Sequence, residues 1–128
     1  MAARRYDGRM NSGFAPSDAV PQVIDGRIDC TVRGSLLLIG INRPDKRNGF
    51  TPAMLEGLAQ AYTRLDDDDS LRIGVLHAMG GHFTAGLDLP AFAPLMRAGA
   101  KAVPVGLVDP LDLGMEGYRR RTKPMVVA

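Results

Sequence analysis

Hydrophobic and polar residues alternate along residues 28–33, and this period of two predicts a half-buried strand. Gly34 and Ser35 follow, and an apolar run over residues 36–41 predicts a second, more deeply buried strand. Two such runs that are separated by two residues, one of them glycine, are typical of a β-hairpin. We therefore expect an antiparallel pair over residues 28–41.

A helix is expected after the loop at residues 42–50, which is rich in Pro, Asn and Gly. Thr51 can cap its first turn, and Pro52 suits the first helical position because its missing N–H is not needed there. An acidic run at residues 66–69 is expected to end the helix as a solvated loop, since it lacks the spacing of a calcium site. The apolar positions recur at helical spacing: Met54, Leu55, Leu58, Ala61, Tyr62 and Leu65.

The remaining pattern predicts a strand at residues 71–79, a helix at 89–98 and a loop or lid at 99–110. A third helix is expected at 111–121, with Arg119, Arg120 and Arg121 as its basic last turn. An apolar run at 125–128 predicts a final strand, and the order of elements predicts an α/β fold. A strand that begins where the sequence stops would be left incomplete, so we expect that the domain is truncated within a core strand.

Composition narrows the class of protein. The 16 basic and 14 acidic residues give a net charge of +2, without the clustered basic face that nucleic-acid binding requires. No stretch approaches the roughly 20 apolar residues that span a bilayer. The single Cys30 cannot form an internal disulfide and is typical of a reducing compartment. We expect a cytoplasmic protein with a flexible arm at residues 1–24 and one domain at 25–128, bound to neither nucleic acid nor membrane.

The candidate chemistry lies at residues 80–89, where a buried strand passes through small residues into a helix. Backbone N–H groups at such a turn can bind an anion or a developing oxyanion, although a purely structural turn has the same pattern. The turn is neither a P-loop nor a dinucleotide-binding turn. His77 and His82 have no third ligand at a recognisable spacing, so no metal site is expected.

Three motifs, in this order and spacing, resemble those of the crotonase superfamily (enoyl-CoA hydratase/isomerase family) from about Ile28 to Ala128. Residues 42–49 read Asn-Arg-Pro-Asp-Lys-Arg-Asn-Gly, where members of the superfamily have Asn-Arg-Pro-x-x-x-Asn-Ala. Residues 80–89 match Gly-x-x-Phe-x-Ala-Gly-x-Asp-Leu, and a Lys-Pro pair at 123–124 precedes an apolar strand. The resemblance implies the N-terminal portion of a spiral of ββα turns, assembled into homo-oligomeric trimers or hexamers.

The resemblance also implies an activity: hydration of trans-2-enoyl-CoA thioesters in fatty-acid metabolism. Leu87 would supply one backbone N–H of the oxyanion hole, and the only coenzyme would be the coenzyme A of the substrate. Lys46 or Arg47 would approach the phosphates of that coenzyme. The residues implied in binding the acyl-CoA thioester are Lys46, Arg47, Asn48, Gly49, Ala85, Gly86, Leu87 and Asp88.

In the superfamily the second oxyanion N–H and the acid and base carboxylates follow the strand that begins here at Met125. We therefore expect residues 1–128 alone to be inactive as a hydratase. One alternative is a non-catalytic remnant or an assembly subunit that binds coenzyme A. Another is an unrelated α/β domain whose glycine-rich turn binds a phosphate.

Overall fold

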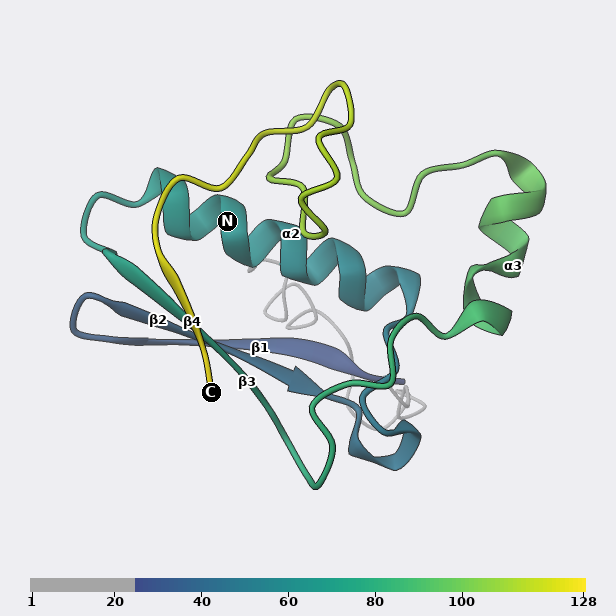
Figure 1. The fold of residues 1–128 in the computed structure, drawn as a ribbon, viewed down its shortest axis with the longest axis horizontal. Coiled ribbons are helices and arrows are strands. Elements are labelled where there is room, and N and C mark those ends of the chain that lie inside the picture. The colour runs from purple at the N-terminus through teal and green to yellow at the C-terminus, as the bar shows by residue number, and fades with distance from the viewer. Residues whose placement is uncertain (1–24) are drawn as a thin grey trace, which may run out of the picture.

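Four strands form one mixed sheet with helices beside it (Figure 1), and the strand order is β1-β2-β3-β4. The computed structural model describes residues 25–128, so the expected arm at residues 1–24 lies outside the described residues. The strands are β1 (Arg27–Arg33), β2 (Leu36–Asn42), β3 (Ile73–Ala78) and β4 (Met125–Val127). The helices are α2 (Pro52–Asp67), α3 (Leu89–Ala98) and the short 3-10 helix η3 (Pro44–Lys46).

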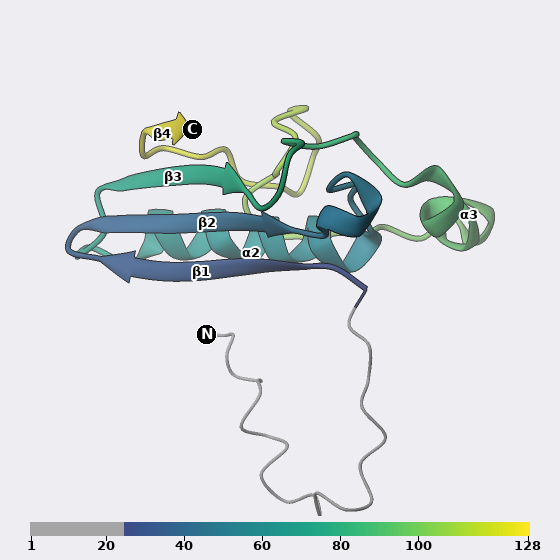
Figure 2. The same cartoon turned by 90° about the horizontal axis from the view of Figure 1, so that it is seen from below.

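The first two strands form the expected antiparallel hairpin, with Val32 opposite Leu37. Gly34 takes a φ of 61° in the connecting turn, a conformation that glycine adopts without steric cost. β2 and β3 are parallel, so the chain needs a crossover between them, and α2 provides it. The carboxyl ends of β2 and β3 therefore lie at the same edge of the sheet (Figure 2).

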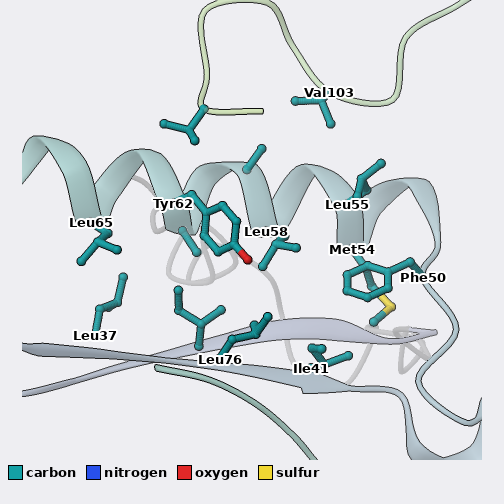
Figure 3. Close-up of a cluster of buried hydrophobic side chains, with 14 of the residues drawn as sticks. Leu37, Ile41, Phe50, Met54, Leu55, Leu58, Tyr62, Leu65, Leu76 and Val103 are labelled. Atoms are coloured by element: carbon teal, nitrogen blue, oxygen red, sulfur yellow. The ribbon is translucent and has the colours of Figure 1, made fainter. Parts of the chain in front are cut away.

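Helix α2 begins as the sequence predicts, because the Thr51 hydroxyl oxygen accepts a hydrogen bond from the Met54 N–H at 3.2 Å. All six apolar positions predicted for its core face are buried. They pack mainly against the inward side chains of the sheet, while Val103 lies on the opposite side of the helix from β2 (Figure 3). The sheet residues in this core include Leu37, Ile39, Ile41 and Leu76.

The helix expected at residues 111–121 is absent, and that prediction is wrong. This segment instead forms turns and an isolated bridge between Val108 and Arg119. The Asp109 carboxylate accepts hydrogen bonds from the N–H groups of Leu111 and Leu113, which competes with the helical ladder. Gly114 and Gly117 then take φ values of 70° and 92°, which no right-handed helix contains. The sequence pattern of residues 111–121 is therefore misleading, because the Asp109 hydrogen bonds and the two glycines favour turns over a helix.

The acidic run at residues 66–69 is not simply a solvated loop, which corrects that prediction too. Asp66 and Asp67 belong to α2, and the Asp66 carboxylate accepts from the backbone N–H groups of Thr122 and Lys123. Asp67 forms an ion pair with Arg119 at 2.7 Å. The Lys123 ammonium donates to the carbonyls of Asp68 and Leu71, both at 2.7 Å. The end of α2 thus anchors the segment that leads into β4.

Candidate active site

A pocket of about 390 Å³ opens between two loops. One loop follows β2 and includes η3, and the other joins β3 to α3; in Figure 1 they lie between the sheet edge and α3. Because β2 and β3 run parallel, their carboxyl ends bring these loops together. The residues that line the pocket are Arg43, Asp45, Lys46, Arg47, Gly49, Ala85, Leu87 and Asp88.

The two loops are joined by an isolated parallel bridge between Phe50 and Leu87. The Phe50 N–H donates to the Gly86 carbonyl at 2.8 Å, and the Asp88 N–H donates to the Phe50 carbonyl at 2.9 Å. Successive N–H groups of an extended segment point to opposite sides, so the Leu87 N–H points away from Phe50. No hydrogen bond among residues 25–128 uses it. The bridge therefore leaves one outward N–H donor at the pocket.

The Thr84 hydroxyl adds a further link between the two loops. The Thr84 hydroxyl donates to the Asn48 carbonyl at 2.7 Å and accepts from the Gly86 N–H at 3.0 Å. Gly86 has a φ of 92°, where an L side chain is strained, so glycine is needed immediately before Leu87. These local contacts fix the backbone that carries the free donor.

Asn48 belongs to the first loop, and its side chain is fully buried and does not line the pocket. Its side-chain amide donates to the carbonyls of Met79 and His82, both at 2.7 Å, and its oxygen accepts from the Arg43 N–H at 2.7 Å. Arg47 and Asn48 both lie in the left-handed region, with φ values of 51° and 56°. Asn tolerates this conformation better than most residues, and its amide ties the first loop to the end of β3.

Arg43 is a site residue that the sequence did not reveal. Its guanidinium is buried, yet it forms ion pairs with Asp25 at 2.7 Å and Asp88 at 2.8 Å. Hydrogen bonds from Arg43 lower the pKa of both carboxyls below the usual range, and the bonds to Asp25 and Asp88 raise the pKa of Arg43. Its position in the Asn-Arg-Pro motif was visible in the sequence. Its partners were not, because Asp25 and Asp88 lie 18 and 45 positions away along the chain.

The structure brings six of the eight residues implied in acyl-CoA binding to one pocket, and leaves out Asn48 and Gly86. Lys46 and Arg47 are exposed, and no hydrogen bond or ion pair recorded within residues 25–128 uses their side chains. His77 lies in β3 and His82 in the following loop. Over the same part of the chain, no group of three or more His, Cys, Asp or Glu residues is placed to hold a metal ion. Nor is any helix there long and apolar enough to cross a membrane.

Residues 31–109 match the family model of enoyl-CoA hydratase/isomerase. The chain belongs to this family. Enoyl-CoA hydratase EchA19 of Mycobacterium tuberculosis is 35% identical over 98 residues, which are 75% of this chain and 36% of that protein. Probable enoyl-CoA hydratase 1, peroxisomal, of Arabidopsis thaliana is 34% identical over 74% of this chain and 33% of its own length. The chain thus spans about a third of these curated relatives.

Solved structures of the family share its fold. A probable enoyl-CoA hydratase/isomerase from Mycobacterium abscessus has a TM-score of 0.71 and 40% identity, covering 79% of this chain and 38% of that one. An enoyl-CoA hydratase from Mycobacterium tuberculosis H37Rv has a TM-score of 0.60 and 33% identity, covering 80% and 37%. The resemblance to the crotonase superfamily, and the fold that it implied, are confirmed.

Proposed function

We propose that this chain binds acyl-CoA thioesters and contributes to the hydration of trans-2-enoyl-CoA in fatty-acid metabolism, as part of an enoyl-CoA hydratase-like enzyme. The observation that carries the proposal is the outward Leu87 N–H at a pocket that Lys46 and Arg47 also line. A fixed backbone donor suits a thioester carbonyl, because enolate-like charge develops on that oxygen and the donor needs no reorganisation.

The two exposed cations fit the other end of such a substrate. Lys46 and Arg47 would attract the phosphates of coenzyme A, which a guanidinium can bind with two parallel hydrogen bonds. Arg47 is held at a φ of 51°, a strained position of the kind that clusters at ligand sites. Coenzyme A would arrive as part of the substrate, so we propose no separate cofactor.

Proton transfer requires groups other than those at this pocket. The two carboxylates that line it are Asp45 and Asp88, and Asp88 is held by Arg43 with a lowered pKa. A carboxyl in that state is a poor general acid. We propose that the acid, the base and a second oxyanion donor come from outside residues 25–128.

A second candidate function is coenzyme A binding without turnover. It is favoured because Asp88 is paired with Arg43 and is therefore poorly suited to transfer a proton. The family resemblance further supports a homo-oligomer, a trimer or hexamer, and the single Cys30 supports a cytoplasmic location. Exposed apolar side chains fit such an assembly, among them Met96, Leu113 and Val126.

Calorimetric titration with crotonyl-CoA, coenzyme A, ADP and inorganic phosphate tests the proposal. We expect both coenzyme A compounds to bind, and the Arg47→Gln variant to bind them about tenfold more weakly, the loss of one charge-assisted contact. The matched control is Arg72→Gln, an exposed arginine next to the start of β3 and outside the pocket. Phosphate binding as strong as coenzyme A binding would favour the unrelated phosphate-binding domain. Hydration of crotonyl-CoA by this chain alone would contradict our assignment of the acid and base to other residues.

A further inference from the structure

We propose that Arg43 is a positioning residue, which acts through Asp88 to orient the Leu87 N–H and to neutralise the carboxylate beside it. This inference rests on the proposed function, because it concerns how the Leu87 donor is prepared for a thioester oxygen. It adds a role for a pocket residue whose buried guanidinium is bonded to other protein groups. The proposal stands on four contacts of one guanidinium.

The Arg43 guanidinium joins both walls of the pocket. Its Nη1 donates to the Gly49 carbonyl at 3.1 Å and to the Asp88 Oδ2 at 2.8 Å. Its Nε and Nη2 donate to the two carboxylate oxygens of Asp25 at 2.9 and 2.7 Å. The bond to Asp88 ties the first loop to the start of α3, while the bonds to Gly49 and Asp25 fix the guanidinium that makes it. A lysine ammonium cannot reproduce this planar arrangement.

Asp88 transmits the constraint to its neighbour Leu87. Its Oδ1 accepts from the Ala91 N–H at 3.3 Å and caps α3, while its Oδ2 is bound by Arg43. Its own N–H donates to the Phe50 carbonyl. Asp88 is thus fixed at three points, and the bond of Gly86 to Phe50 fixes the other side of Leu87. The direction of the Leu87 N–H follows from these anchors.

The pair also sets the charge beside the donor. The Asp88 side chain is 25% exposed and that of Asp25 is 64% exposed, so water screens the Asp88 carboxylate less than the Asp25 carboxylate. Without Arg43, that negative charge would oppose charge developing on an oxygen bound to the adjacent residue. Asp25 does not line the pocket, so its better-screened charge lies outside the site. Of the two carboxylates on Arg43, only Asp88 is expected to affect the donor.

This difference between the two carboxylates provides a matched test. Asp88→Asn removes the ion pair and the negative charge together but keeps an oxygen that can cap α3, because Asn is as good an N-cap as Asp. A carbonyl shift that is lost in this variant therefore reports on the orientation of the Leu87 N–H, since the opposing charge is gone as well. Asp25→Asn removes the other ion pair of the same guanidinium. The readout is the infrared carbonyl stretch of bound, 13C-labelled crotonyl-CoA, alongside the affinity for coenzyme A, which has no carbonyl at this position.

We expect the wild-type chain to lower the carbonyl frequency on binding, and the thioester bound to Asp88→Asn to lose that shift. Asp25→Asn, which lies outside the pocket, should keep both the shift and the affinity for coenzyme A. Arg43→Lys, which keeps the charge without the planar group, should lose the shift as well. An unshifted carbonyl in the bound wild type would defeat the proposed function itself. A wild-type shift that survives in Asp88→Asn or Arg43→Lys, or disappears equally in Asp25→Asn, would overturn the role of Arg43 and leave the proposed function standing.

Discussion

Phe50 and Leu87 face each other in a parallel bridge that joins two loops 37 positions apart in the sequence, the difference between 87 and 50. Both bonds of the bridge use the backbone of Phe50, and they involve the residues on either side of Leu87. Leu87 therefore lies in a fixed segment at the pocket, and its own N–H points away from Phe50. The backbone bonds between the two loops thus hold one free N–H donor in place.

The buried amide of Asn48 is the first place to test how that segment is held. In Asn48→Ala, two carbonyls and the Arg43 N–H lose their buried partner. We expect a loss of about 3 kcal/mol in the free energy of unfolding, because unsatisfied buried groups cost about 1–3 kcal/mol each and some regain water. Urea denaturation measures it. Asn42→Ala is the control, since the Asn42 amide makes one half-buried bond to Asp29 and should lose about 1 kcal/mol. Equal losses would contradict the role of Asn48.

Two glycines of the second loop separate backbone strain from steric crowding. A Cβ added at Gly86 or at Gly81 would meet no atom within 4 Å, but only Gly86 has a positive φ. Gly86→Ala should therefore lose about 1–2 kcal/mol of stability, the cost of placing an L residue there. Gly81→Ala should be neutral or stabilising by up to about 1 kcal/mol. Thermal unfolding of both variants measures this, and a neutral Gly86→Ala would mean that its φ is not required.

Lys123 and Lys46 are expected to affect different properties, the first the stability of the fold and the second the binding of coenzyme A. Lys123 donates to two carbonyls just beyond α2, whereas Lys46 has no such partner within residues 25–128. Lys123→Met should lose about 1–2 kcal/mol of stability and keep coenzyme A binding. Lys46→Met should keep stability within about 0.5 kcal/mol and bind coenzyme A more weakly. Denaturation and calorimetry on both variants test this, and the same effect on both quantities in both variants would contradict the separation.

Acid should destabilise the fold through its aspartates. Hydrogen bonds lower the pKa of Asp25 and Asp88 (from Arg43), of Asp67 (from Arg119) and of Asp68 (from Ser70). A carboxyl whose pKa is lower in the folded state stabilises the fold above the unfolded pKa, and this is lost as pH falls through the folded value. We expect the midpoint of thermal unfolding to be flat above about pH 5 and to fall below about pH 4. Asp67→Asn should weaken this dependence, and a midpoint that rises toward acid would contradict the sign.

Local signals predicted most of the framework and little of the polar network. The hairpin, the Thr51 cap and the buried face of α2 all depend on neighbours in sequence, and the sequence pattern predicts them correctly. The helix expected at residues 111–121 failed because the hydrogen bonds of Asp109 compete with helical ones. Arg43 was missed because its partner Asp88 is 45 positions away, and no local pattern encodes that contact.

The free Leu87 N–H is the central claim, and one substitution tests it directly. Leu87→Pro removes the N–H, which no bond within residues 25–128 uses, whereas Leu87→Ala keeps it. The measurement compares calorimetric affinities for crotonyl-CoA and for a thioether analogue without the carbonyl. We expect the wild type and Leu87→Ala to prefer the thioester by about tenfold, the worth of one hydrogen bond to a polarised oxygen, and Leu87→Pro to lose that preference while remaining folded. A folded Leu87→Pro variant that keeps the full preference would show that Leu87 is not the donor.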